Sequence, residues 1–196
     1  MAEQRDETKA IRIQSDRTHE REHSTPIYLT SSFVFDDAEQ MRATFAAEQE
    51  GNIYSRFTNP NVKEFVDKMV ALEGAEAGYA TATGMASVFA SIAGLLKMGD
   101  HILVCRSIFG SSHTVFTKIL PKWGITHTYV SIDEQDSWET EVKENTKMLF
   151  IETPSNPAVD LVDLEKAGKL AKKHDLIFNV DNCFATPYLQ QPAKLG

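Results

Sequence analysis

The chain has 196 residues, of which 42% are hydrophobic and 24% charged, a balance typical of a globular domain with a core of its own. Its 20 basic side chains are outnumbered by 28 acidic ones, and the formal net charge of -8 argues against binding to nucleic acid or to an anionic membrane. The two cysteines lie outside any C-x-x-C pair, which predicts a cytoplasmic protein without disulfides. The N-terminus is polar and no apolar run reaches ~18 residues, so neither a signal peptide nor a membrane span is expected.

The first part of the chain predicts an arm followed by two helices. Residues 1–24 are polar and lack periodicity, whereas 25–35 (TPIYLTSSFVF) is rich in β-branched and aromatic residues and is predicted to be extended. Acidic N-cap candidates and helical spacing predict a short helix within 36–50. A loop at 51–61 then leads to an amphipathic helix within 62–75, which a glycine is expected to stop.

Short apolar runs alternate with helical stretches in the remainder of the chain. The predicted strands are 78–82, 101–105, 126–130, 148–152 and 176–181. Helical stretches are predicted to begin near residues 85, 111, 136 and 163. Repeated strand-then-helix order predicts an α/β fold with a mainly parallel sheet and helices on both faces. Ligands bind such sheets at the carboxyl ends of the strands, so the turns at those ends are the candidate sites.

The turn after the first predicted strand contains Thr83, Gly84 and Met85 and opens a helix. Glycine lacks the Cβ that would block a ligand, and free N–H groups together with the helix dipole favour an anion there. The alternative is a tight strand-to-helix turn in which glycine serves packing alone. No G-x-G-x-x-G or G-x-x-x-x-G-K-[ST] motif occurs, so dinucleotide and P-loop sites are weakly supported.

Four further positions could contact a ligand, and each also has a structural explanation. Phe109 follows a strand and could stack on a planar ligand or simply join the core. Asn156 lies between two prolines and could bind a ligand or build a turn. Asp181 closes a buried strand and therefore needs a cation or a hydrogen-bond donor. Tyr54 and Arg56 form a loop pair suited to phosphate or carboxylate, or an ordinary exposed loop.

The segment HEREH at 19–23 matches the H-E-x-x-H pattern of zinc hydrolases. In such an enzyme His19 and His23 would bind zinc and Glu20 would act as the base. The flanking sequence does not form a strong amphipathic helix, and a proline follows closely. Zinc hydrolysis therefore stays a remote alternative, and no metal is expected.

Five blocks of the sequence carry a family resemblance over nearly the whole chain. They are HSTPIYLTSSFVF, YSRFTNPN, LEGAEAGYATATGMAS, ETPSNP and VDNCFATPYLQQP. In this order they resemble the Cys/Met-metabolism (trans-sulfuration) family of enzymes that depend on pyridoxal 5'-phosphate (PLP). The resemblance implies an aspartate-aminotransferase-like large domain (PLP fold type I), with residues 1–50 as an arm and short helix for contacts between subunits and 51–196 as an incomplete PLP-binding domain.

The resemblance also implies roles for individual residues around the cofactor ring. Asp181 would pair with the protonated pyridine nitrogen, so that the ring can take up negative charge from the substrate. Phe109 would stack on the ring, and Asn156 would lie near its phenolic oxygen. Of these, Asp181 and Phe109 are implied to act in catalysis, together with Tyr54.

The cofactor phosphate is implied to lie at the turn formed by Thr83, Gly84 and Met85. In the family, Tyr54 and Arg56 reach the phosphate in a neighbouring subunit. The resemblance therefore implies a homo-oligomer with shared sites, a tetramer by family pattern, acting on a small amino-acid substrate.

The segment SIFGSSHTVF distinguishes among the reactions of the family. Many γ-lyases and γ-synthases have tyrosine where this chain has Phe109, and the segment is most similar to O-succinylhomoserine sulfhydrylases. The resemblance thus implies PLP-dependent γ-replacement on an O-acylhomoserine. Cystathionine γ-synthase and methionine γ-lyase activities are the alternatives.

The lysine that forms the Schiff base with PLP in this family is not in the sequence. Its Ser-x-Thr-Lys block would follow the last residues, and Lys194 does not stand in that motif. The C-terminal small domain of the family is also absent. The expectation is therefore a large domain truncated before that lysine. The alternative is that the 196 residues are the whole product and form a non-catalytic module.

Overall fold

The computed structural model describes residues 4–195, so residues 1–3 of the predicted arm and residue 196 lie outside it. The chain divides into two compact units, Met1–Ala80 and Thr81–Gly196. This division does not coincide with the boundary expected at residue 50. That boundary separates residues for subunit contacts from residues for cofactor binding, and it stays a prediction. Within the described part, no helix is long and apolar enough to cross a membrane.

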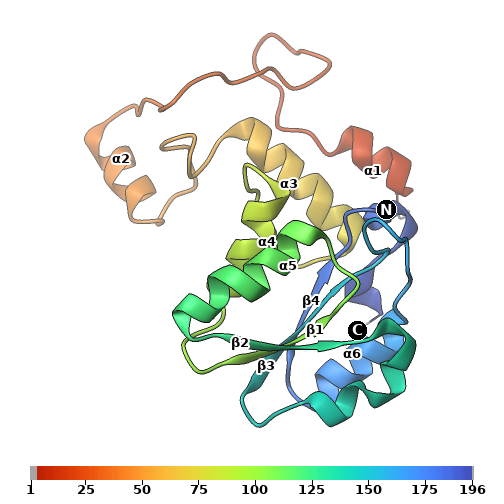
Figure 1. Ribbon diagram of the computed structural model, residues 1–196. Coiled ribbons are helices and arrows are strands. Elements are labelled where there is room, and N and C mark those ends of the chain that lie inside the picture. The colour runs from red at the N-terminus through yellow and green to blue at the C-terminus, as the bar shows by residue number, and fades with distance from the viewer. Residues whose placement is uncertain (1–3, 196) are drawn as a thin grey trace. The chain divides into compact units, whose positions relative to one another are not determined.

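The second unit is built on a four-stranded parallel sheet with strand order β2-β1-β3-β4 (Figure 1). Its strands are β1 (His101–Cys105), β2 (Thr126–Val130), β3 (Thr146–Glu152) and β4 (Ile177–Asp181). All five residues of the central strand β1 are buried, as its continuous apolar sequence predicts for a strand covered on both faces. The predicted α/β fold with a parallel sheet is confirmed.

Helices cover both faces of this sheet (Figure 1). The helices of this unit are α4 (Gly84–Ala93), α5 (Gly110–Thr114), α6 (Leu164–Lys173) and α7 (Thr186–Leu189), with a π-helical stretch at Val115–Ile119 and 3-10 stretches at Leu120–Trp123, Ile132–Glu141 and Pro192–Lys194. On one face, Val104 and Phe150 pack with Ile92 of α4. On the other face, Leu103 packs with Trp138 and with residues of α6. The two clusters use alternate residues of each strand, which is the period of a strand buried on both sides.

One predicted strand is wrong, and one predicted helix has a different form. The segment 78–82 forms no strand among the described residues, and Tyr79 is 80% exposed. A strand needs a neighbour to pair its backbone groups, and the small side chains of this segment bury little apolar surface. The helix predicted near residue 136 is a 3-10 stretch, Ile132–Glu141, with non-helical backbone at Glu134. It is anchored by one buried side chain, Trp138, rather than by an amphipathic face.

The first unit contains α1 (Asp6–Arg12), α2 (Ala38–Phe45) and α3 (Pro60–Glu73). α1 was not predicted, because its seven residues bury no side chain and present no apolar face. α3 begins two residues before the predicted start, because Asn59 caps it and proline occupies its first position. It ends at Gly74 in the left-handed conformation, with φ of 68°, as the expected glycine stop requires.

Polar contacts from α3 hold the extended arm of the first unit. The side chain of Asn61 accepts the Tyr28 N–H at 2.8 Å and donates to the Pro26 carbonyl at 2.7 Å. Glu64 accepts the Ser15 N–H at 3.1 Å and bonds the Thr25 hydroxyl. The arm is therefore ordered by hydrogen bonds to one helix, and among residues 4–80 only Thr44 and Asn59 are buried.

Candidate functional site

Two carboxylates lie side by side at the carboxyl end of the sheet. Glu152 ends β3 and Asp181 ends β4, and the two residues are paired in register. Paired residues of neighbouring parallel strands point to the same face of the sheet. Glu152 is two residues beyond Phe150, so this face is the one covered by α4 and by the π-helical stretch Val115–Ile119.

The N-terminus of α4 offers unused backbone donors. Thr83 caps the helix, and its Oγ1 accepts the Ala86 N–H at 3.1 Å. The N–H groups of Gly84 and Met85 donate to no protein acceptor among the described residues. A Cβ added at Gly84 would meet no atom within 4 Å, so there is room for a ligand above these donors. Two free N–H groups at the positive end of a ten-residue helix suit an anion.

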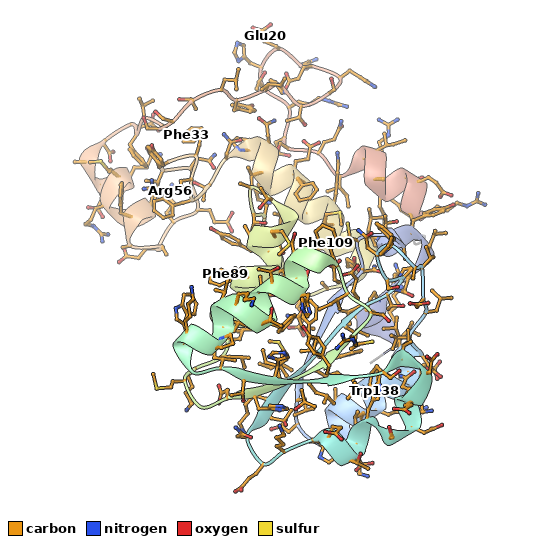
Figure 2. All side chains as sticks on the ribbon, in the orientation of Figure 1. Glu20, Phe33, Arg56, Phe89, Phe109 and Trp138 are labelled. Carbon is orange, nitrogen blue, oxygen red and sulfur yellow. The ribbon has the colours of Figure 1, made fainter. Side chains whose placement is uncertain are left out.

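Phe109 lies in the N-cap position of α5, where the chain leaves β1 (Figure 2). Its side chain is 42% exposed and is not part of either core cluster. The neighbouring Gly110 would also accept a Cβ without contact. The ring is thus available to stack on a ligand, and the core interpretation of Phe109 is wrong.

Asp181 is half-buried, and its partner is a backbone donor. The Cys183 N–H donates to Asp181 Oδ1 at 3.0 Å, and the Thr153 N–H donates to the Asp181 carbonyl at 3.2 Å. In the described part of the chain, Asp181 makes no ion pair. The expected partner is therefore a hydrogen-bond donor, and the carboxylate keeps capacity for a cationic ligand.

Asn156 belongs to a loop held by hydrogen bonds from both sides. Its N–H donates to Glu152 Oε1 at 2.9 Å, and Ser155 exchanges hydrogen bonds with Asp160 at 3.0 and 3.2 Å. Both X-Pro bonds of this loop, Thr153–Pro154 and Asn156–Pro157, are cis. The half-buried side chain of Asn156 makes no hydrogen bond of its own within the described part.

Glu152 is a residue of this site that sequence reasoning missed. It is 5% exposed, and its Oε2 accepts the Phe109 N–H at 2.8 Å. Burial raises the pKa of the Glu152 carboxyl and the Asp181 charge raises it further, while the hydrogen bonds from Phe109 and Asn156 act in the opposite direction. A signal was available, because Glu152 closes an apolar run just as Asp181 does.

Tyr54 and Arg56 form a separate group in the first unit. The Arg56 guanidinium lies 5.0 Å from the centre of the Tyr54 ring and 5.1 Å from that of Phe57. Tyr54 pairs with Ser32 in an isolated antiparallel bridge, and the Ser55 N–H donates to the Ser31 carbonyl at 2.8 Å. The loop is thereby fixed to the arm while its ring and cation face outward.

The zinc interpretation lacks the helix that it requires. Residues 19–23 are not helical, so the two histidines do not share a helix face. His19 instead contacts Glu20 at 2.9 Å, and both side chains are largely exposed. The part of the chain that the structure describes contains no cluster of three metal-binding side chains.

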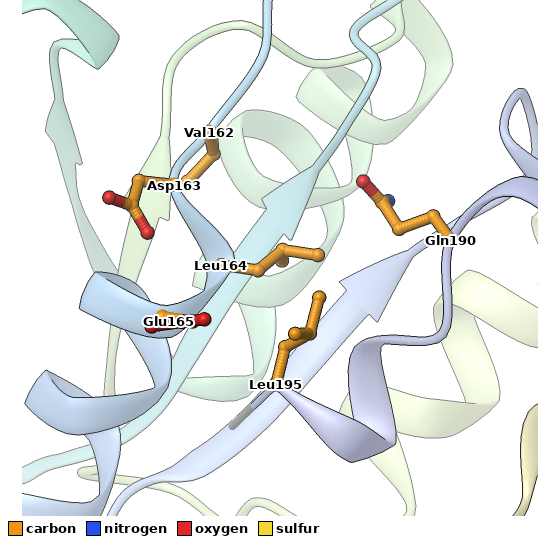
Figure 3. A pocket seen from close by; sticks show the side chains of 6 residues that line it. All are labelled: Val162, Asp163, Leu164, Glu165, Gln190 and Leu195. Atoms are coloured by element: carbon orange, nitrogen blue, oxygen red, sulfur yellow. The ribbon is translucent and has the colours of Figure 1, made fainter.

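A cavity of about 440 Å³ lies elsewhere in the second unit, beside the start of α6 (Figure 3). It is lined by Val162, Asp163, Leu164, Glu165, Gln190 and Leu195. None of the candidate residues borders it, and the Gln190 amide is already bonded to Thr153 and Asn182, both at 2.8 Å. The candidate residues therefore lie away from this cavity.

The chain is similar to known proteins over nearly its whole length. A family model described as Cys/Met metabolism PLP-dependent enzyme matches residues 7–196. An O-succinylhomoserine sulfhydrylase of Pseudomonas aeruginosa is 45% identical over 190 residues, which cover 97% of this chain and 47% of the relative. An L-methionine gamma-lyase of Fusobacterium nucleatum subsp. polymorphum is 41% identical over 172 residues, which cover 87% of this chain and 44% of that protein.

The fold has a solved counterpart. A Campylobacter jejuni protein assigned as an O-acetylhomoserine (thiol)-lyase, which carries N'-pyridoxyl-lysine-5'-monophosphate, matches with a TM-score of 0.93 and 34% identity over 99% of this chain and 48% of its own. The chain thus spans about half the length of the relatives that it matches. The family model covers nearly all of this sequence, and the chain belongs to the Cys/Met metabolism family of PLP-dependent enzymes.

Proposed function

We propose that the second unit binds PLP, with the ring at the carboxyl end of the sheet and the phosphate at Thr83, Gly84 and Met85, where α4 begins. The observation that carries this proposal is the pair of unused N–H groups at the start of α4, with open space where Gly84 lacks a Cβ. A phosphate would accept these N–H groups and neutralise the positive end of the helix dipole.

The other strand-end residues fit the remainder of the cofactor. The half-exposed ring of Phe109 would stack on the pyridine ring, and Asp181 would accept a hydrogen bond from its protonated nitrogen. The unbonded amide of Asn156 would contact the phenolic oxygen. When bound, PLP supplies the electron sink for negative charge that develops on an amino-acid substrate.

We further propose that Tyr54 and Arg56 contribute to the phosphate site of a second copy of the chain. Both belong to a loop that hydrogen bonds fix to the arm, and the Arg56 guanidinium lies 5.0 and 5.1 Å from the centres of two aromatic rings. Residues 1–50 would then serve contacts between subunits and 51–196 the cofactor, in a homotetramer. Cys183 is exposed and free, which fits a reducing, cytoplasmic compartment.

The proposed reaction is γ-replacement on an O-acylhomoserine, in which sulfide displaces the acyl group. Its support is the 45% identity to an O-succinylhomoserine sulfhydrylase. Elimination, as in the L-methionine gamma-lyase that is 41% identical, is the second candidate. The lysine block expected from the family is not in this sequence, so turnover is proposed for a protein that joins this chain to that lysine.

An assay of such a protein tests the reaction. With O-succinylhomoserine and sulfide, replacement yields homocysteine, whereas elimination yields a 2-oxo acid and ammonia. Asp181→Ala removes the negative charge beside the ring nitrogen and should reduce both products below detection. Wild-type turnover in Asp181→Ala would contradict the assignment of Asp181.

Phe109→Tyr tests the assignment of the subgroup. The added hydroxyl can carry a proton at a ring that otherwise only stacks, so the ratio of elimination to replacement should rise. An unchanged ratio would remove Phe109 as support for the sulfhydrylase reaction.

A further inference from the structure

Glu152 joins two loops that leave different strands. Its Oε2 accepts the N–H of Phe109, which follows β1, at 2.8 Å. Its Oε1 accepts the N–H of Asn156, which follows β3, at 2.9 Å. The first of these bonds spans 43 positions of the chain. One side chain therefore sets the distance between the loop that carries the exposed ring and the loop that carries the free amide.

This carboxylate is costly to bury, and no cation offsets the cost. Glu152 is 5% exposed and makes no ion pair among the described residues. The titratable group that acts on it is Asp181, which is paired with it across β3 and β4 and carries charge of the same sign. Its stabilising partners are the two backbone N–H groups, which are charge-assisted donors at short distance.

We propose that Glu152 is a positioning residue for the cofactor site, holding the Phe109 and Asn156 loops in the arrangement that faces the ligand beside Asp181. The inference rests on the proposed PLP function for the identity of the ligand. The two hydrogen bonds to Glu152 stand independently of it. Burial raises the pKa of the Glu152 carboxyl. Its protonation should affect both hydrogen bonds at once, since the Phe109 and Asn156 N–H groups donate to the same carboxylate.

The first test follows the backbone amides of the 196-residue chain by NMR as pH is varied. The N–H signals of Phe109 and Asn156 should shift with one common midpoint, above the value of about 4.3 for an unperturbed glutamate. The Cys183 N–H reports Asp181 separately, because it donates to the Asp181 carboxylate. Separate midpoints for Phe109 and Asn156 would overturn the proposal without the need for any variant.

The second test is the variant Glu152→Gln. An amide replaces one acceptor oxygen with an NH₂ donor, so it can accept only one of the two N–H groups. The N–H that loses its acceptor should exchange with solvent about 10- to 100-fold faster, the range expected for loss of a hydrogen bond to a charged group. Glu144→Gln is the matched control, because Glu144 is exposed and outside the site.

Ligand binding separates a positioning role from a purely structural one. Pyridoxamine 5'-phosphate is the probe, because it has an amine in place of the aldehyde of PLP and does not react with lysine side chains. Glu152→Gln should weaken its binding by about tenfold, the effect of a loosened site, while Glu144→Gln leaves binding unchanged. Binding unchanged by Glu152→Gln would overturn the positioning role alone. No binding to wild type would overturn the proposed function, and the positioning role with it.

Discussion

The two units of this chain are stabilised by different means. The second unit has a parallel sheet between two buried apolar clusters. In the described part of the first unit only Thr44 and Asn59 are buried, and large apolar side chains of its arm such as Leu29 and Val34 are more than nine-tenths exposed. Apolar burial is the main driving force of folding, whereas hydrogen bonds contribute modestly to net stability. The second unit should therefore be much more stable than the first, and substitutions in the two should have different consequences.

The largest effect is expected from truncating one phenylalanine in each unit. Phe150 in β3 is 1% exposed, and Phe150→Ala should lower the free energy of unfolding by about 3–5 kcal/mol. Phe65 in α3 is 56% exposed, and Phe65→Ala should change it by less than about 0.5 kcal/mol. Urea unfolding followed by tryptophan fluorescence measures the second unit, since Trp123 and Trp138 both lie there. The hydrogen-exchange rates of α3 amides supply the same comparison for the first unit. Equal effects of the two substitutions would show that the contrast between the units is wrong.

The next effect is a loss of stability of the second unit in mild acid. His101 is fully buried between Thr128 and Thr146, and burial lowers its pKa from 6.5 to about 4, with Lys143 and His127 adding to the shift. The unfolded chain therefore takes up this proton first as pH falls. The contribution of neutral His101 to the free energy of unfolding should be fully present above pH 6.5. It should fall by about 3 kcal/mol as pH drops to about 4.

Urea unfolding at a series of pH values measures this slope. His101→Gln should flatten it between pH 6.5 and 4, whereas the exposed His19→Gln should leave it unchanged. A slope that persists in His101→Gln would assign the acid sensitivity to another group.

The first unit should respond to acid at lower pH. The ion pair with Lys68 at 2.8 Å, with the Thr25 and Ser15 hydrogen bonds, lowers the pKa of Glu64 from 4.5 to about 2. The contribution of Glu64 is present above pH 4.5 and is lost as pH falls toward 2. Glu64→Gln should weaken docking of the arm on α3 by about 1.5–3 kcal/mol. The exchange rate of the Ser15 amide measures this change, with the exposed Glu76→Gln as control.

The smallest effect on stability is expected at Gly84, where binding should change most. A Cβ there meets no protein atom, so Gly84→Ala should alter the free energy of unfolding by less than about 0.5 kcal/mol. The same methyl group would occupy the space proposed for the phosphate, so binding of pyridoxamine 5'-phosphate should weaken. Unchanged affinity in Gly84→Ala would place the phosphate elsewhere.

The sequence predicted the strands that consist of apolar residues and the helix that ends at a glycine. The central strands appear in the sequence as continuous apolar runs, and Gly74 marks the end of α3. The strand expected at 78–82 depends on a neighbour that local pattern does not reveal. The seven-residue helix α1 buries nothing and therefore has no periodic signal.

The candidate site was predictable residue by residue but not as an arrangement. Asp181 ends β4 and Gly84 begins α4, and both positions follow from strand and helix boundaries that the sequence predicts. The contact between Glu152 and Phe109 joins positions 43 apart, so no local pattern contains it. The unused N–H groups of Met85 and its neighbour likewise emerge only once the cap of α4 is seen.

The central claim is that the N-terminus of α4, in the second unit, binds the phosphate of a pyridoxal-type cofactor. The most direct measurement compares pyridoxamine 5'-phosphate with pyridoxamine, its form without phosphate, by titrating the chain and following backbone amide shifts. The account predicts saturable shifts centred on Gly84 and Met85 with pyridoxamine 5'-phosphate and much smaller ones with pyridoxamine. Shifts that are absent, or that are the same for both ligands, would contradict it.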